Sequence, residues 1–193
     1  MNSGFLNFID SVVEIPEGQK QKFEALITTK QLNKGDFYVR QGQYPNSIAF
    51  LTKGLFRYFY LGNKGEEFTK GFFTENTVLS AYSALIEDRV SYFSIEALED
   101  SDIEVVDYFE LQKLFKEDPC WNKFLVVMLE KAFVIKETRE REFLLLDAEE
   151  RYKGFLERFP GLENRVKQNI IASYLGIAPE SLSRVRKKMG LLT

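Results

Sequence analysis

The stretch from Gln168 to Lys188, QNIIASYLGIAPESLSRVRKK, constrains the fold of this chain more than any other. Its spacing is typical of two short helices that cross at a tight turn. Ala172 provides a small side chain where the helices approach, and Gly176 tolerates the positive φ that the turn requires. Pro179 suits the first turn of the second helix, where its missing N–H has no intrahelical acceptor. The stretch therefore predicts a helix-turn-helix whose inward-facing apolar residues are Ile171, Leu175, Ile177, Leu182 and Val185.

The second helix of this motif has a polar and basic outer face. With Leu182 and Val185 turned inward, the side chains that project outward are Glu180, Ser181, Ser183, Arg184, Lys187 and Lys188. Arginine can donate two hydrogen bonds to guanine, glutamate can accept one from cytosine, and lysine can neutralise phosphate. This composition favours a DNA recognition helix. A solvated basic helix that closes a small bundle would explain the charges, but not the spacing of the small and apolar residues.

Charge is distributed unevenly along the 193 residues, whose net charge is −3. Residues 151–193 carry nine Lys and Arg and three Glu, a net charge of +6, whereas the preceding residues carry −9. This asymmetry indicates an anionic partner for the C-terminal segment alone. No apolar run approaches the ~20 residues that span a bilayer, and the N-terminus has no signal-like pattern. We therefore expect a cytoplasmic protein with no membrane partner.

The chain has one cysteine, Cys120, and no histidine. These counts exclude an intramolecular disulfide, a cysteine-ligated iron–sulfur cluster, a zinc finger, a His-ligated haem and histidine-based acid–base catalysis. Cys120, beside Trp121, is expected to be a small buried hydrophobic residue, because no histidine is present to activate it as a nucleophile. The sequence therefore predicts no catalytic residue and no metal site.

The region before residue 118 is predicted to be rich in strands. Two short helices are expected at 5–12 and 17–27, followed by β-branched and aromatic runs that alternate with glycine-bearing turns. We expect about eight strands in an antiparallel barrel, roll or sandwich, with a hairpin turn at 62–65 and a short helix at 80–87. The expected strands include 37–39, 47–52, 55–61, 67–73, 91–98 and 101–108, with Glu99-Asp100 as the turn between the last two.

A long helix is expected over 118–146, because Asp118 can cap it and Pro119 can occupy its first turn. At 1.5 Å per residue, a helix of ~28 residues spans about 42 Å, more than a domain of this size covers. Part of its apolar stripe is therefore predicted to form a dimer seam; the alternative is that it packs only on its own β-domain. Further helices are expected over 147–158 and from Arg165. The apolar positions at helical spacing are Phe124, Val127, Met128, Val134, Ile135 and Leu145.

In this order of elements, the chain resembles the Crp/Fnr superfamily of bacterial transcription regulators over almost its whole length. The resemblance is carried by LNKGDFYVRQGQYPNSIAFLTKGLFRYFY at 32–60, FSIEALEDSDIEVVD at 93–107 and IIASYLGIAPESLSRVRKK at 170–188. It implies an α+β fold with an N-terminal antiparallel β-roll (a double-stranded β-helix, cyclic-nucleotide-binding-like), a long dimerisation helix and a C-terminal helix-turn-helix. The corresponding domains are expected at 1–117, 118–146 and 147–193.

The same resemblance implies a homodimer, joined through the long helix, that binds double-stranded DNA with two recognition helices one DNA turn apart. RNA polymerase is a further implied partner. Pro179 stands where the family often has an arginine, so one guanine contact is expected to be absent, and the sequence printed here lacks residues for the C-terminal wing hairpin of many members. The positions that correspond to base contacts are Glu180, Ser181 and Arg184, those assigned to phosphates are Arg186, Lys187 and Lys188, and Gln168 and Ser183 complete the expected DNA-binding set.

The effector site departs from the family pattern. Cyclic-nucleotide binders hold the phosphate in a cassette with a Gly-Glu-Leu segment, a helix, and an Arg followed by Ser or Thr. Here Ser80-Ala81-Tyr82 and Ser91-Tyr92 occupy those places, so the ribose acceptor and the phosphate charge are both absent. Arg89 lies two residues away from the arginine position, several ångströms along an extended chain. We therefore expect no cyclic AMP binding of the usual kind.

Two alternatives remain for what occupies the predicted pocket. Either it takes another, unidentified small-molecule effector, or aromatic side chains fill it. No other cofactor is expected. The candidate pocket residues are Ser80, Ala81, Tyr82, Arg89, Ser91 and Tyr92.

Two other functions compete with that of a DNA-binding regulator. An effector-sensing module could dock on other proteins through its helix-turn-helix, and failure to bind any duplex at low salt would favour this alternative. An enzyme of the cupin-like barrels is disfavoured, because those barrels usually bind metal through histidine, which this chain lacks.

Overall fold

Two four-stranded antiparallel sheets form a β-roll in the computed structural model, which describes residues 3–191. The strand orders are β1-β8-β3-β6 and β2-β7-β4-β5. The strands are β1 Thr28–Leu32, β2 Phe37–Val39, β3 Ser47–Lys53, β4 Phe56–Leu61, β5 Glu67–Phe73, β6 Thr77–Leu79, β7 Ser94–Ala97 and β8 Ser101–Asp107.

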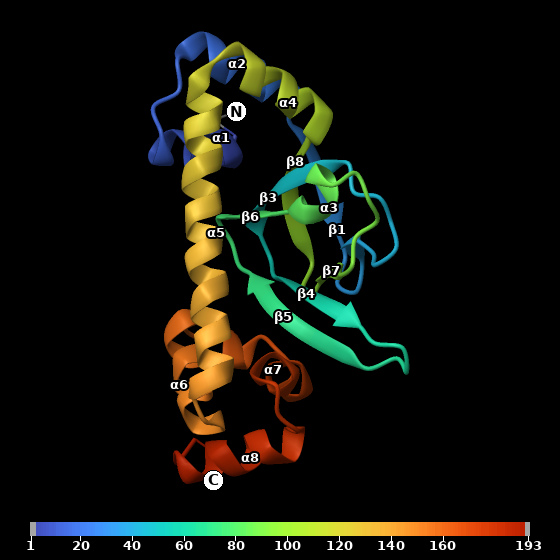
Figure 1. The fold of residues 1–193 in the computed structure, drawn as a ribbon, viewed down its shortest axis with the longest axis vertical. Helices are drawn as coiled ribbons and strands as arrows, with labels where there is room; N and C mark the ends of the chain where they lie inside the picture. Colours follow the sequence, from blue (N-terminus) through green and yellow to red (C-terminus); the bar gives the residue numbers. More distant parts are fainter. Residues whose placement is uncertain (1–2, 192–193) are drawn as a thin grey trace.

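Helices lie before the roll, after it and once within it. The long helix α5 runs along the length of the molecule, with α1 and α2 near one end and α8 at the other (Figure 1). This arrangement separates the roll from the basic C-terminal helix. The helices are α1 Gly4–Val12, α2 Glu17–Leu26, α3 Tyr82–Ile86, α4 Tyr108–Glu117, α5 Pro119–Leu145, α6 Ala148–Arg158, the 3-10 turn η1 Leu162–Asn164, α7 Gln168–Leu175 and α8 Pro179–Lys188.

The inner faces of the two sheets form the core of the roll. Strand β8 illustrates the period of two, because Ile103 and Val105 are buried while Asp102 and Glu104 are half-exposed. Leu51 on the neighbouring strand β3 and Ile95 on β7 of the other sheet are both fully buried. Burial of each such side chain stabilises the fold by about 1.5–3 kcal/mol.

The predicted hairpin at 62–65 is confirmed as the β4–β5 connection. Gly62 N donates to Glu66 O at 2.8 Å, and Gly65 has φ +84°. The pairing of β4 with β5 is then interrupted by a bulge, since Phe59 pairs with Thr69 and Tyr58 with Gly71. Lys70 lies between these two pairs, on the bulged strand.

The long helix begins where the sequence predicts. Asp118 Oδ1 accepts from Cys120 N at 2.9 Å, and Pro119 occupies the first helical position. Trp121 is fully buried, stacks on Phe23 with ring centroids 5.1 Å apart, and donates from its indole N–H to the side chain of Gln19 at 2.9 Å. The start of α5 is thereby fixed to α2.

Several expected elements differ from the structure. Strands β1 and β6 and helix α4 were not predicted, and α4 forms because Asp107, at the end of β8, caps it at Phe109 N and Glu110 N. The strand expected at 91–98 is shorter, because the chain turns at Ser91. Strands β7 and β8 lie in different sheets, so the turn between them is not a hairpin.

Candidate DNA-binding surface and effector cavity

The helix-turn-helix forms from α7 and α8 with the turn geometry that the sequence predicts. Gly176 has φ +68°, and Pro179 is the first residue of α8. A Cβ at Gly176 would also lie 2.6 Å from Phe143 Cε1 of α5, so glycine is needed for space as well as for φ. Ala172 and Leu182 are fully buried where the two helices meet. The prediction of this motif is confirmed.

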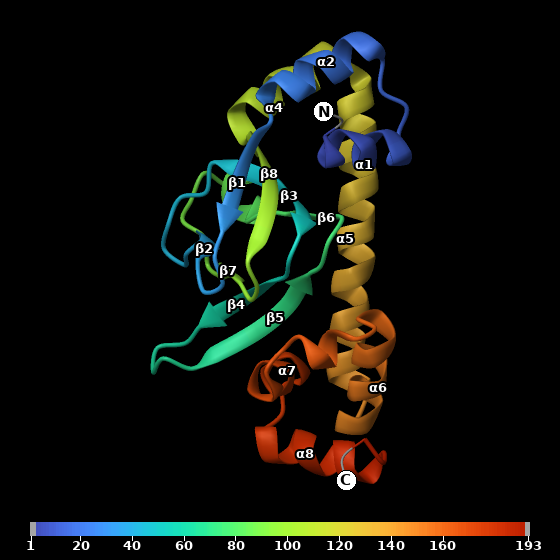
Figure 2. The same ribbon diagram turned by 180° about the vertical axis from the view of Figure 1, so that it is seen from behind.

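The outward face of α8 is polar and basic, and no other element among residues 3–191 covers it. Helix α8 lies at the end of the molecule remote from α2 and α4 and beyond the end of α5 (Figure 2). Arg184 Nη2 donates to Ser181 Oγ at 3.0 Å, which holds the guanidinium along the helix surface. Of the DNA-binding residues predicted from the sequence, those that are exposed are Gln168, Glu180, Ser183, Arg184, Lys187 and Lys188, and Ser181 is half-exposed.

Two of the residues assigned to phosphate have partners or surroundings that the sequence did not indicate. Lys188 Nζ lies 2.6 Å from Glu149 Oε2 of α6, and the lysines Lys153 and Lys188 lower the pKa of Glu149 to about 2. Arg186 is half-buried, and its Nε is enclosed without a hydrogen-bond partner. Lys187 is therefore the better candidate for a phosphate contact.

The helix-turn-helix is docked on the roll, a contact that sequence reasoning missed. Ser173 Oγ of α7 accepts from Thr69 N at 2.9 Å and donates to Glu67 O at 2.8 Å, on the edge strand β5. Phe72 of the same strand packs among the aromatic rings of the DNA-binding domain, including Tyr174 at 5.3 Å. These partners are about a hundred residues apart in the chain, so no local pattern reveals them.

Arg165 makes a second link between the two parts. It was expected to begin a helix, but it lies between η1 and α7, which begins only at Gln168. Its guanidinium bonds Glu75 at 2.7 Å and Glu99 at 2.8 Å and donates to Gly54 O at 3.3 Å. The Arg165 hydrogen bond holds the pKa of Glu75 below its usual range.

A buried carboxylate connects the end of α5 to the DNA-binding domain. Glu142 is only 7% exposed and pairs with Arg158 of α6 and, at 3.5 Å, with Arg139. Both arginines also bind Tyr174 of α7: Arg139 donates to its carbonyl at 2.7 Å, and Arg158 to its hydroxyl at 2.8 Å. Glu142 thus links α5 to α6 directly and, through the two arginines, to α7.

The six predicted effector residues do not form one site. Ser80 and Tyr82 line a cavity between the roll and α5, but Ala81 is fully buried in the core. Ser91 is also buried, and its hydroxyl donates to Phe93 O at 2.7 Å. That bond turns the chain, so the next residue, Tyr92, faces outward.

Arg89 does not take the place of the missing cassette arginine. Its Nε pairs with Glu87, and its guanidinium lies 3.8 Å from the ring centroid of the exposed Tyr92. Neither residue lines the cavity that contains Ser80 and Tyr82. The structure therefore does not bring Ala81, Arg89, Ser91 and Tyr92 together with Ser80 and Tyr82 around this cavity.

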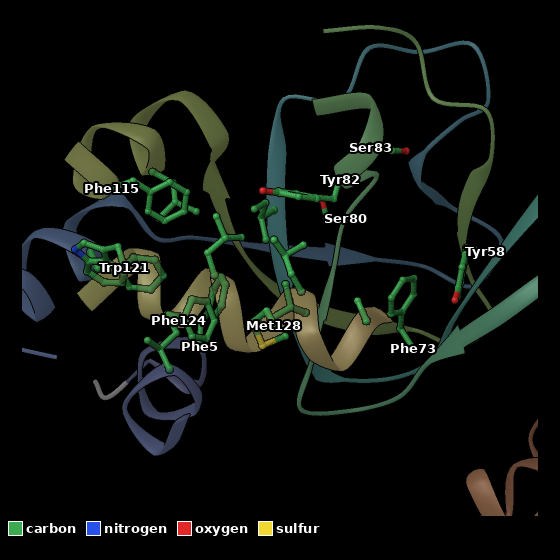
Figure 3. Close-up of a pocket in the computed structure, with 18 of the residues that line it drawn as sticks. Phe5, Tyr58, Phe73, Ser80, Tyr82, Ser83, Phe115, Trp121, Phe124 and Met128 are labelled. Atoms are coloured by element: carbon green, nitrogen blue, oxygen red, sulfur yellow. The ribbon is translucent and has the colours of Figure 1, made fainter. Parts of the chain in front are cut away.

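The cavity that is present lies between the roll and α5 and has a volume of about 340 Å³. Its wall on α5 includes Trp121, Phe124 and Met128, and the roll contributes Tyr58, Phe73, Ser80 and Tyr82 (Figure 3). A volume of this order fits a small molecule. Burial raises the pKa values of Tyr58 and Tyr82 to about 12, so both hydroxyls are protonated at neutral pH.

Two kinds of site are not found in the described part of the chain. Residues 3–191 contain no group of three or more Cys, Asp or Glu placed to hold a metal ion. No helix over the same residues is both long and apolar enough to cross a bilayer.

The thiol of Cys120 is expected to be unreactive. It is only 6% exposed, and burial, together with Asp118, raises its pKa to about 11. The thiolate is the reactive form of cysteine, and the raised pKa leaves a smaller fraction of it in the folded protein. We therefore expect the folded protein to react with a disulfide reagent at pH 7.5 at least tenfold more slowly than the unfolded protein. Absorbance of the released thiolate measures this, and rates that are equal in the two states would contradict it.

A β-roll, a long helix and an exposed basic helix of a helix-turn-helix, in this order, form the arrangement that the sequence predicts for a DNA-binding regulator with an attached sensor-type domain. Comparison with known proteins agrees. Residues 29–118 match the family model of the cyclic nucleotide-binding domain. Transcriptional activator protein Anr of Pseudomonas protegens is 27% identical over 169 residues, which cover 81% of this chain and 68% of Anr.

Solved structures show the same fold. The c-di-GMP-responsive regulator CLP of Xanthomonas campestris has a TM-score of 0.74 at 17% identity, covering 91% of this chain and 92% of CLP. FixK2 of Bradyrhizobium japonicum has a TM-score of 0.76 at 18% identity, covering 85% and 84%. The resemblance to the Crp/Fnr transcription regulators is therefore confirmed, since the curated relatives are transcription regulators, not enzymes.

Proposed function

We propose that this chain acts as a homodimer that binds a specific, near-palindromic DNA site and is controlled by a small-molecule effector other than cyclic AMP. The observation that carries the proposal is the outward face of α8, where Arg184 and Lys187 are exposed at the free end of the molecule. The curated relative Anr is a transcriptional activator, which supports the same function.

The proposed dimer seam lies on α5. Eight large apolar side chains on this helix are exposed to solvent. Four of them, spaced by three, four and eleven residues, lie on one face. Exposed apolar surface of this extent indicates a protein interface. The residues are Val126 (52% exposed), Leu129 (43%), Phe133 (66%) and Leu144 (75%). Of the apolar positions singled out in the sequence, Phe124 is buried and cannot belong to this seam.

The absence of cyclic AMP control is supported by the lining of the cavity. It contains no arginine and no carboxylate, the two groups that would bind the phosphate and the ribose. A thermal shift with cyclic AMP tests this directly, since a ligand at 100 times its dissociation constant adds about 2.7 kcal/mol of stability. No shift is expected.

The experiment that tests DNA recognition is selection of bound sequences from a pool of random duplexes, using the whole chain at moderate salt. A two-fold symmetric consensus with half-sites about ten base pairs apart is expected. RNA polymerase can then be added to the selected site to test the further partner. If no duplex binds even at low salt, the alternative of a protein-docking module is favoured.

Arg184 is expected to read a base on that selected site. Arg184→Ala should weaken binding by about 1–3 kcal/mol on the consensus, with a smaller loss on random DNA, because the guanidinium can donate two hydrogen bonds to guanine. Fluorescence anisotropy with both duplexes measures the two losses. Lys187→Ala is the matched comparison, and its loss should be nearly equal on both. Equal losses for Arg184→Ala would assign this residue to phosphate instead.

A further inference from the structure

The walls of the cavity between the roll and α5 are almost entirely apolar. Aromatic rings from five parts of the chain meet there, from α1, α2, the roll, α4 and α5. The side chains carry no hydrogen-bonding groups over most of this surface, so the cavity suits the hydrocarbon part of a ligand. The apolar residues around its floor are Phe5, Ile9, Phe73, Phe93, Phe115 and Phe124.

The charged groups around this space all have one sign. Lys70 is the charged residue of the cavity. A second cavity of about 520 Å³ adjoins it and shares six lining residues, including Lys70, and adds Lys131, Arg139 and Arg158. Among the residues lining the two cavities, all in the described part of the chain, none is Asp or Glu. In a protein of net charge −3, such a segregation of cations favours an anionic ligand.

Two of these four cations already have a counter-ion. Arg139 and Arg158 pair with Glu142. Lys70 and Lys131 form no ion pair with any residue between 3 and 191. The charge available to a ligand is therefore that of the two lysines, and Lys70 is the one common to both cavities.

The position of Lys70 follows from the bulge in strand β5. A bulge changes the direction in which a side chain points, and here the ammonium lies over aromatic rings of the roll. Lys70 Nζ is 5.1 Å from the ring centroid of Phe93 and 5.4 Å from that of Tyr58. Gly71 leaves room for this, because a Cβ there would lie 2.5 Å from the Tyr58 ring. The ammonium is thus held at the apolar wall without a carboxylate partner.

Hydrogen-bond donors lie on the same walls. Ser80 Oγ is enclosed and has no hydrogen-bond partner. Tyr58 and Tyr82 also line the cavity, and their hydroxyls keep their protons, as described above. A buried hydroxyl without a partner is destabilising, and an acceptor on a ligand would relieve this.

We propose that the cavity binds a small carboxylic acid with an apolar body, its carboxylate at Lys70 and its hydrocarbon part along Phe124 and Met128. Aliphatic and aryl-alkyl acids share this chemistry. The proposal supplies a ligand class for the effector of the proposed function, but binding itself does not depend on DNA recognition.

Binding can be observed at the cavity itself, because Trp121 is the only tryptophan of the chain and lines the cavity. We would titrate the whole protein with hexanoate, octanoate and decanoate and follow Trp121 fluorescence and the heat of binding. One ligand per chain is expected, with affinity rising about fourfold per methylene. 1-Decanol should bind roughly tenfold more weakly than decanoate, and decylamine should not bind detectably. 4-Phenylbutanoate, which has as many non-hydrogen atoms as decanoate, distinguishes an aromatic from an aliphatic body by its relative affinity.

Three variants test the assignment to this site. Lys70→Met keeps the length of the side chain and should weaken decanoate binding roughly tenfold while leaving decanol unchanged. Lys64→Met, on the exposed hairpin turn, is the matched control and should bind as the parent does. Ala132→Phe fills the cavity from the exposed side of α5 and should abolish binding of both ligands. Circular dichroism verifies that each variant is folded.

Results that overturn the proposal are equal affinities for decanoate and decanol, or equal effects of Lys70→Met and Lys64→Met. These outcomes leave the DNA-binding proposal intact, because the selection experiment is done without ligand. Conversely, a failure to select any DNA site would leave saturable, Lys70-dependent decanoate binding intact. The two proposals can therefore fail separately.

Discussion

Replacing Glu142 by alanine is expected to lower the free energy of unfolding by about 3–5 kcal/mol. The side chain is 7% exposed, and its removal leaves Arg139 and Arg158, which both contact Tyr174, without a counter-ion. The penalty comes chiefly from these uncompensated charges, since the arginine side chains are only 14% and 26% exposed. Chemical denaturation, followed by far-ultraviolet circular dichroism, measures the change.

Glu140→Ala is the matched control, because Glu140 lies half a turn earlier on the same helix and is exposed. We expect it to change the free energy of unfolding by less than about 0.5 kcal/mol. The double variant Glu142→Leu with Arg158→Met should be less destabilised than Glu142→Leu alone, because it also removes one of the unpaired charges. If the double variant were the less stable of the two, the ion pair itself, not the unpaired charge, would be the main source of stability.

The same cluster has a consequence for DNA binding. Glu142 and Tyr174 join α5 to the first helix of the helix-turn-helix, and Ser173 joins that helix to strand β5. The recognition helix therefore has a fixed orientation relative to its own roll in this structure. A variant that weakens the cluster should accordingly lose affinity for the selected DNA site under conditions where it is still folded.

Local signals account for the elements that the sequence predicted well. Gly176 with its positive φ, Pro179 at the first helical position and Asp118 at the helix cap are decided by residues within one or two turns of chain. Strong turn residues likewise marked the hairpin at 62–65. Helix α4 was not predicted, because its cap Asp107 is also the last residue of strand β8. No loop with turn residues separates the strand from the helix.

Contacts between distant segments account for what the sequence could not reveal. The candidate effector residues were chosen by alignment with a cassette, but the hydrogen bond of Ser91 to Phe93 turns the chain and places Tyr92 outside the cavity. Lys70 was not predicted as a site residue, because its position depends on a bulge that exists only in the pairing of two strands. Charge alone likewise assigned Arg186 to DNA, although this residue of α8 is half-buried.

Replacing Phe133 by glutamate is expected to convert the proposed dimer to a monomer. Phe133 is 66% exposed in the single chain and lies between Leu129 and Leu144 on the exposed face of α5. A two-fold seam would bury the Phe133 ring of each subunit. Burial of one such ring contributes about 1.5–3 kcal/mol, so the variant loses about 3–6 kcal/mol of dimerisation free energy before repulsion between the two carboxylates is counted. Sedimentation equilibrium at micromolar concentration measures the change in mass.

The affinity for the palindromic site should decrease when the dimer is lost. A monomer contacts only one half-site, so the second contact no longer adds to the first. We expect the affinity for the selected palindrome to drop at least about 100-fold, while affinity for a single half-site is unchanged. Phe109→Glu is the matched control, because Phe109 is 58% exposed but lies on α4, away from the seam. A Phe133→Glu protein that still sediments as a dimer would place the interface on another surface, whereas a monomer that still binds the palindrome tightly would contradict the requirement for two recognition helices.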